Sequence, residues 1–87
     1  MYTAHAEARC QQRSISNEVV EVLLAYGESG RHQGADIYYL TRPARRRAQA
    51  ALGDRYRRLE RRLNSYLVVG EDGSLVTAGR RYRRLKF

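Results

Sequence analysis

The sequence lacks the features by which many small proteins replace or extend a hydrophobic core. It has one cysteine, one proline and no tryptophan among 87 residues, so neither an internal disulfide framework nor a cysteine-based zinc cage can form. Its longest uncharged apolar run, residues 22–26, is far shorter than the ~20 residues that cross a bilayer. No basic, apolar and small-residue sequence opens the chain, so we expect no signal peptide. These absences predict one cytoplasmic domain over residues 1–87, without membrane contact.

Acidic residues are scarce in the second half of the chain. Residues 1–41 carry three arginines and five carboxylates, a net of −2, whereas residues 42–87 carry thirteen arginines and Lys86 against four carboxylates, a net of +10. Arginine presents a planar fork of donors that fits phosphate. Such a segment can also be a solvated surface, but the asymmetry favours a patch that contacts nucleic acid or a ribosome. The candidate nucleic-acid-binding residues are Arg42, Arg45, Arg46, Arg47, Arg57, Arg58, Arg61, Arg62, Arg80, Arg83 and Arg84.

Two helices are predicted at the start of the chain. Thr3 is suited to cap a helix over residues 4–13, and Ser16 to cap a second helix that ends at Gly27. The apolar side chains around this second helix recur with helical period, at Ile15, Val19, Val22, Leu23 and Tyr26.

The rest of the sequence predicts short strands around a further helical region. Residues 28–35 have no periodicity and indicate a loop or a ragged edge strand, whereas residues 36–41 favour a strand. A helical stripe from Pro43 onward is interrupted at residues 53–54, which leaves open one kinked helix or two short ones. Residues 66–70 and 75–79 form a hairpin pattern around an Asp-Gly turn. Together these elements predict an α+β domain with an antiparallel sheet.

The first predicted helix has a polar side that carries candidate catalytic residues. His5, Arg9, Gln12 and Arg13 are spaced so that their side chains project from one side of a helix. An imidazole moves protons near neutral pH, and guanidinium groups hold a phosphate, so this combination suits cleavage of a phosphodiester without a metal ion. The alternative is a solvated polar face that contains a histidine.

The remaining histidine and the cysteine do not extend this site. His32 lies in a glycine-containing segment and is expected at the surface, whereas Cys10 points away from His5 and is expected to be a small core thiol. Two histidines and one cysteine at these separations match no metal motif, so we expect neither a metal nor another cofactor.

The order of residues in the first helix resembles a known family. His5-Ala6, Arg9, Arg13 and Ile15-Ser16 match the H-A-x-x-R-x-x-x-R-x-I-S start of the family known as domain of unknown function 4258. The hairpin that ends in Gly79-Arg80-Arg81 is similar to the last strands of RelE/ParE-type toxins. The resemblance covers residues 3–28 and 66–82.

This resemblance implies a fold and a set of functional positions. The fold would be RelE-like, with two N-terminal helices packed on a small curled antiparallel sheet and residues 42–64 as an inserted arginine-rich helical segment. The implied catalytic residues are His5, Arg9, Arg13 and Arg81, with Thr77 a weaker candidate. Arg80 stands where related toxins often have histidine, so a second acid/base group is missing.

Two functional hypotheses follow. The first is a small, metal-independent endoribonuclease, as the toxin of a toxin–antitoxin pair, with RNA or a ribosome as target and an acidic antitoxin as partner. The second is a non-catalytic protein that binds nucleic acid or an acidic protein, such as a phage or plasmid inhibitor of a nucleic-acid machine.

Overall fold

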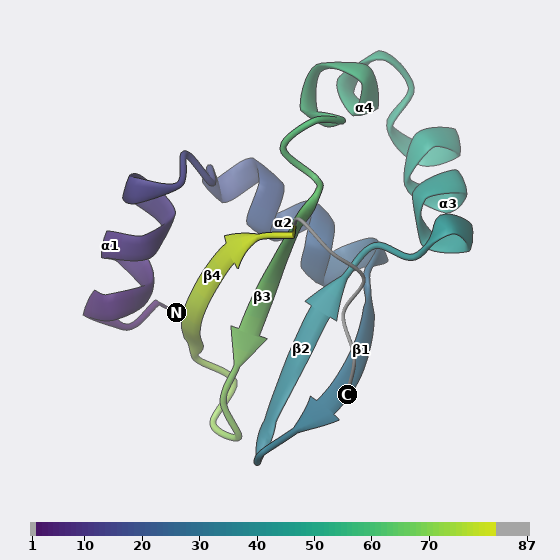
Figure 1. The fold of residues 1–87 in the computed structure, drawn as a ribbon. Coiled ribbons are helices and arrows are strands. Elements are labelled where there is room, and N and C mark those ends of the chain that lie inside the picture. The colour runs from purple at the N-terminus through teal and green to yellow at the C-terminus, as the bar shows by residue number, and fades with distance from the viewer. Residues whose placement is uncertain (1, 82–87) are drawn as a thin grey trace.

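The computed structural model describes residues 2–81, which form an α+β domain with four helices and one four-stranded sheet (Figure 1). The helices are α1 (Ala4–Gln12), α2 (Asn17–Tyr26), α3 (Arg42–Leu52) and α4 (Asp54–Leu59). The predicted caps are confirmed, because Thr3 Oγ1 accepts from the Ala6 N–H at 3.1 Å and Ser16 Oγ from the Val19 N–H at 3.3 Å. Each side chain thereby pairs a backbone donor that the first helical turn leaves without a partner.

The sheet contains β1 (Glu28–His32), β2 (Ala35–Tyr39), β3 (Ser65–Val69) and β4 (Leu75–Arg80), in that order and antiparallel throughout. The segment over residues 28–35 is therefore an edge strand and a tight turn, rather than a loop. Gln33 and Gly34 both have positive φ, which is the geometry of a two-residue hairpin loop whose twist matches that of the strands.

The helical region between β2 and β3 divides into two helices. Gly53 separates α3 from α4 with φ 57° and ψ −125°, a conformation open to glycine but strained for other residues. Both helices lie beyond one end of the sheet, where β2 and β4 finish and β3 begins (Figure 1). The apolar residues of this region turn inward, so Ala44, Ala48, Tyr56 and Leu59 are buried and the arginines are left outside.

The core lies between the sheet and the helices. α2 packs behind β2 and β3, and α1 lies alongside β4 at the edge of the sheet (Figure 1). The predicted apolar stripe of α2 is confirmed, with Ile15, Val19, Val22 and Leu23 buried. Cys10 is also buried, as expected.

The side of the sheet opposite α2 carries no helix among residues 2–81 (Figure 1). We call this side the outer face. The strand register places on it Ile37, Tyr39, Tyr66, Val68, Thr77 and Gly79 of β2 to β4, together with Ala35 and, from β1, Glu28, Gly30 and His32. The alternate residues of β3 and β4, Leu67 and Ala78, face the core.

Candidate nucleic-acid interface

α1 runs parallel to β4 over its whole length. At its start, the Thr3 N–H donates to the Leu75 carbonyl at 3.0 Å, and just beyond its end the Arg13 carbonyl accepts from Arg80 Nε at 3.3 Å. Ten residues of helix and five of strand both span roughly 15–17 Å, so the two elements keep level with each other. The side chains along α1 therefore form a row beside the strand that carries Thr77.

One side of α1, which we call the α1 flank, carries His5, Arg9, Gln12 and Arg13. Arg9 Nε donates to His5 Nε2 at 3.4 Å, so the predicted i, i+4 neighbours are in contact. Around the helix, buried Ala6 lies between this flank and the side that carries Glu7 and Cys10. His5 is exposed, while Arg9 and Arg13 are half-buried.

The last two arginines of the described chain diverge to opposite sides of the sheet. Arg80 pairs in register with buried Ser65 and reaches the end of α1 on the core side. Arg81 turns to the outer face, where its Nη1 donates to the Leu40 carbonyl at 2.9 Å and its guanidinium lies 4.9 Å from the centre of the Tyr39 ring. Arg81 is thus held at the end of β2 by a hydrogen bond and a cation–π contact.

The five implied catalytic residues are therefore only partly brought together. His5 and Arg9 touch, Arg13 continues the same flank, and Thr77 faces outward from the neighbouring strand. Arg81 shares the outer face, but within residues 2–81 no hydrogen bond joins it to α1. The groups that it contacts, the Leu40 carbonyl and the Tyr39 ring, lie on the far side of β3.

Most arginines in the described part of the chain have no carboxylate partner. Of the fourteen arginines in residues 2–81, only Arg31 and Arg55 have a described carboxylate oxygen within 4.0 Å. The other twelve, which we call the unpaired arginines, are Arg9, Arg13, Arg42, Arg45, Arg46, Arg47, Arg57, Arg58, Arg61, Arg62, Arg80 and Arg81. Arg83 and Arg84, the other predicted ligands, lie outside the described residues.

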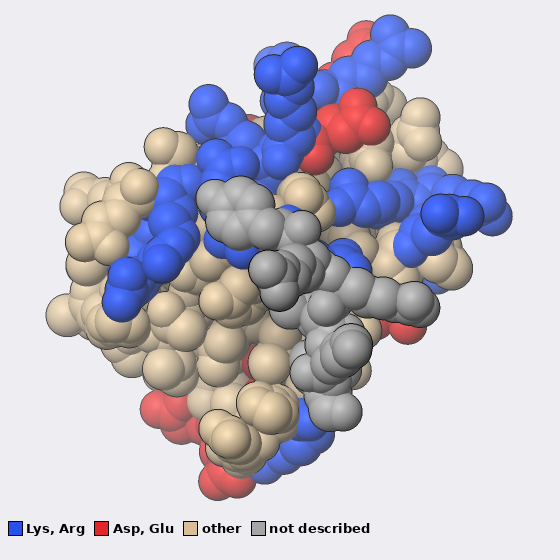
Figure 2. Space-filling model, in the orientation of Figure 1, with Lys and Arg blue, Asp and Glu red and all other residues tan. Residues whose placement is uncertain are grey.

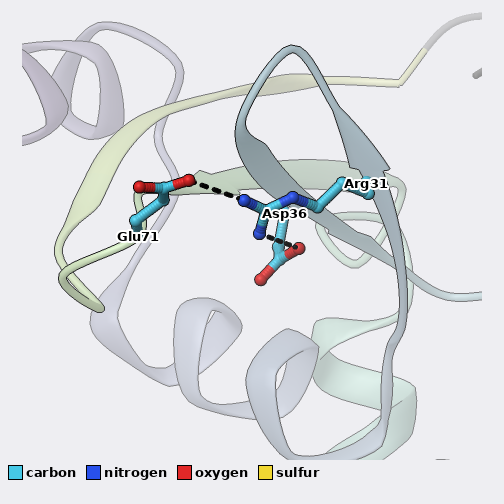
Figure 3. Close-up of polar contacts among 3 residues, drawn as sticks. All are labelled: Arg31, Asp36 and Glu71. Atoms are coloured by element: carbon cyan, nitrogen blue, oxygen red, sulfur yellow. Dashed lines mark hydrogen bonds and ion pairs between the residues drawn. The ribbon is translucent and has the colours of Figure 1, made fainter.

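These arginines are segregated within the molecule. Figure 2 shows basic side chains gathered over α1 and across the end of the domain where α3 and α4 lie, with acidic side chains more frequent at the opposite end. At that opposite end, Arg31 is neutralised by Asp36 at 3.4 Å and by Glu71 at 2.8 Å (Figure 3). The unequal charge of the two halves of the sequence thus appears in the fold as a separation of basic and acidic side chains between the two ends of the sheet.

The arginines of α3 lie where they oppose helix formation. Arg42 is in the first turn of α3, which contains no acidic residue, and Arg45 and Arg46 follow in the next turn. Cations near a helix N-terminus face the positive end of the helix dipole. The Glu28 carboxylate, which accepts from Thr41 Oγ1, is the anionic group bonded at this helix start. A bound polyanion would offset the repulsion that remains between these arginines and the positive end of the helix dipole.

An open pocket of about 610 Å³ lies on the other side of α1. Its lining includes Tyr2, Glu7, Cys10, Ser16 and Arg62. The Tyr2 hydroxyl donates to Asn17 Oδ1 at 2.9 Å within it. Burial raises the pKa of the Cys10 thiol, which keeps the sulfur in its neutral, weakly nucleophilic form. The pocket therefore holds no activated nucleophile from this cysteine, and His5 lies on the opposite flank of the helix.

The outer face includes an aromatic residue that charge and motif patterns do not single out. Tyr66 of β3 is half-buried, and its ring lies against Gly79 of β4. The signal in the sequence is the period-two spacing of Tyr66 with Val68 and of Ile37 with Tyr39, which places all four on one side of a sheet. The sequence does not show that this side is the outer face, because that depends on the side of the sheet against which α2 packs.

The described residues contain no group of three or more histidine, cysteine, aspartate or glutamate side chains placed to hold a metal ion. No helix within residues 2–81 is long and apolar enough to span a bilayer. Comparison of the chain with protein-family models, curated proteins and solved structures finds no match.

Proposed function

We propose that this protein binds RNA through its unpaired arginines and cleaves the phosphodiester backbone without a metal ion. His5 is the proton-transfer group, and Arg9 and Arg13 are the phosphate ligands. The observation that carries the proposal is the contact between His5 Nε2 and Arg9 Nε on the α1 flank, where His5 is exposed and Arg13 is a second unpaired arginine. Arginine clusters of this kind bind the backbone irrespective of base sequence.

The chemistry follows from the two groups in contact. A phosphate that draws the Arg9 guanidinium away frees the lone pair of Nε2, because that nitrogen accepts the Arg9 N–H in the free protein. Nε2 then takes the proton of the ribose 2′-hydroxyl, O2′ attacks phosphorus, and the bond from phosphorus to O5′ breaks. The imidazolium returns its proton to O5′, which gives a 2′,3′-cyclic phosphate and a 5′-hydroxyl. The arginines offset the charge that develops on the phosphoryl oxygens.

A second candidate function is non-catalytic binding of a nucleic acid or an acidic protein. The contacts of Arg81 favour it, because a guanidinium that is hydrogen-bonded to the Leu40 carbonyl and lies over the Tyr39 ring is not directed at a phosphate beside His5. The α1 flank also contributes a single acid/base group, His5. In either case, an acidic segment of a partner such as an antitoxin would complement the same arginines.

Incubation of RNA with the purified protein in the presence of EDTA separates the two functions. We expect the wild type and His32→Ala to release fragments with 2′,3′-cyclic phosphate ends, because His32 is an exposed residue of β1 at a distance from α1. We expect His5→Ala to bind RNA equally and to leave it intact. If the wild type and both variants bind RNA and none cleaves it, the non-catalytic function is supported. Absence of RNA binding would refute cleavage and RNA binding alike.

A further inference from the structure

We propose that the outer face of the sheet holds unpaired bases of single-stranded RNA, with the Tyr66 ring as the surface on which a base stacks. The inference rests on the proposed RNA binding and deepens it, since it names the form of RNA that the site accepts. It assigns to the outer face a role in choosing the substrate, separate from proton transfer by His5.

The part of the outer face between β2 and β3 differs in composition from a solvated sheet surface. Ile37, Tyr39, Tyr66 and Val68 form two adjacent cross-strand pairs, Tyr39 with Tyr66 and Ile37 with Val68. None of the four belongs to the buried core cluster or to the partly buried residues that pack against it. A half-buried aromatic and aliphatic surface, bordered by arginines, complements bases and phosphates together.

Gly79 fixes the direction of the Tyr66 ring. A Cβ at residue 79 would lie 2.7 Å from Tyr66 Oη, 2.8 Å from Cζ and 2.9 Å from Cε1. The ring therefore extends from β3 across the backbone of β4, toward the side on which α1 lies. Any larger residue at position 79 would displace it, so the glycine lets the aromatic ring lie over β4, the strand next to α1.

Arg81 adds a second planar group on the same face. Its guanidinium is oriented by the Leu40 carbonyl and by the Tyr39 ring beneath it. Guanidinium planes and aromatic rings both stack with nucleobases, and this contact tolerates any base because every base has a π face. Tyr66 lies opposite Tyr39 in the register, so the two planar groups are carried side by side on the outer face, the ring over β4 and the guanidinium over the end of β2.

The backbone of the RNA would follow the arginines on either side of these rings. Arg9 and Arg13 belong to α1, which packs against β4 at the edge of the sheet. The unpaired arginines of α3 and α4 belong to the helices that lie beyond one end of the sheet, where basic side chains gather (Figures 1 and 2). A duplex keeps its bases stacked inside the helix and offers this face only phosphates and ribose. The aromatic surface can therefore be used only by a single strand.

Binding is tested with a fluorescently labelled, 2′-O-methylated single-stranded oligouridylate and with the same strand in a duplex, since 2′-O-methylation blocks cleavage. We expect the wild type to prefer the single strand, Tyr66→Phe to keep that preference, and Tyr66→Leu to weaken single-strand binding about tenfold while duplex binding is unchanged. Gly79→Ala should weaken single-strand binding in the wild type. In the Tyr66→Leu protein it should have no further effect, because the ring that it displaces is gone.

The results separate this inference from the proposed function. Equal binding of single strand and duplex by the wild type, unaffected by Tyr66→Leu, would overturn the inference and leave RNA binding in place. Absence of binding to either oligonucleotide would overturn the proposed function and the inference with it. Thermal unfolding of each variant identifies any loss of binding that is due to misfolding, and Tyr66→Phe then serves as the folded comparison for Tyr66→Leu.

Discussion

Gly27 lies directly against the carbonyl oxygen of Leu23. Its N–H donates to that oxygen at 2.9 Å, and a Cβ at residue 27 would lie 2.3 Å from the same oxygen and 3.1 Å from the Tyr39 carbonyl oxygen. The glycine thus lets the chain leave α2 and enter β1 in close contact with the end of β2. Both obstructing atoms belong to the backbone, which cannot rotate away as a side chain can.

We therefore expect Gly27→Ala to reduce the free energy of unfolding by about 1–3 kcal/mol, the usual cost of overpacking. Urea denaturation measures it. Gly70→Ala is the matched control, because the nearest atoms to its Cβ are side-chain atoms of Asp72 and Val76, each at 3.3 Å. Equal losses for the two variants would contradict the role given to the helix-end contact.

Cys10 makes stability depend on pH in the alkaline range. Burial raises the pKa of its thiol above the ordinary value of 9.0, so the folded protein binds the thiol proton more tightly than the unfolded chain does. The contribution of this group to stability is complete below pH 9.0 and falls as the pH rises through the ordinary value toward the folded one.

We expect the wild type to lose more stability than Cys10→Ala when each is taken from neutral pH to above pH 9, measured as the change in melting temperature. Each protein is compared with itself at two pH values, so the loss of stability that the smaller alanine side chain causes at every pH cancels. In the folded wild type, the thiol should also react with a disulfide reagent much more slowly than after denaturation. Parallel pH profiles for the two proteins would contradict this prediction.

Two arginines with different surroundings test the role of the unpaired set in RNA binding. Arg46 is exposed on α3 without a described carboxylate partner, whereas Arg31 is bound by Asp36 and Glu71 at the other end of the sheet. If six to ten phosphates are neutralised, affinity should fall by about 10³ to 10⁵ between 50 and 200 mM salt. Arg46→Gln should weaken binding and reduce the salt slope by about one, while Arg31→Gln leaves both nearly unchanged. Similar effects of the two substitutions would indicate attraction by net charge alone.

The fold class was predictable because the helix signals are local. Thr3 and Ser16 satisfy backbone donors of the same helical turn, and the spacing of Val19 and Leu23 needs only the helical period. The strand over residues 28–32 gave no such signal, because its pattern does not alternate. It is a strand because the edge of β2 offers it backbone partners, and that pairing is a tertiary interaction.

The candidate site was predictable in part for the same reason. The contact between His5 and Arg9 follows from their separation along one helix. The directions of Arg80 and Arg81 depend instead on the register of β4, where Val68 pairs with Thr77 and Val69 with Leu75. The extra residue, Val76, changes which side of the sheet each later residue faces. Pairing between distant segments decides this, and a motif cannot show it.

The start of α3 provides a test in which stability and binding change in opposite directions. Arg42 occupies the first turn of α3, which holds no acidic residue, and its charge faces the positive end of the helix dipole. Arg42→Glu replaces this repulsion with an attraction, so we expect the free energy of unfolding to rise by about 0.5–1 kcal/mol at low salt.

The same substitution should weaken RNA binding, because it removes an unpaired cation and adds an anion at the end of the domain where the arginines gather. Arg42→Gln, which removes the charge without reversing it, should give intermediate values of both quantities. Chemical denaturation and oligonucleotide titration at the same ionic strength measure them. A variant that gains stability and keeps its affinity for RNA would show that Arg42 is a solvated surface residue. A gain in stability together with a loss of affinity would show that the charge that destabilises the helix contributes to RNA binding.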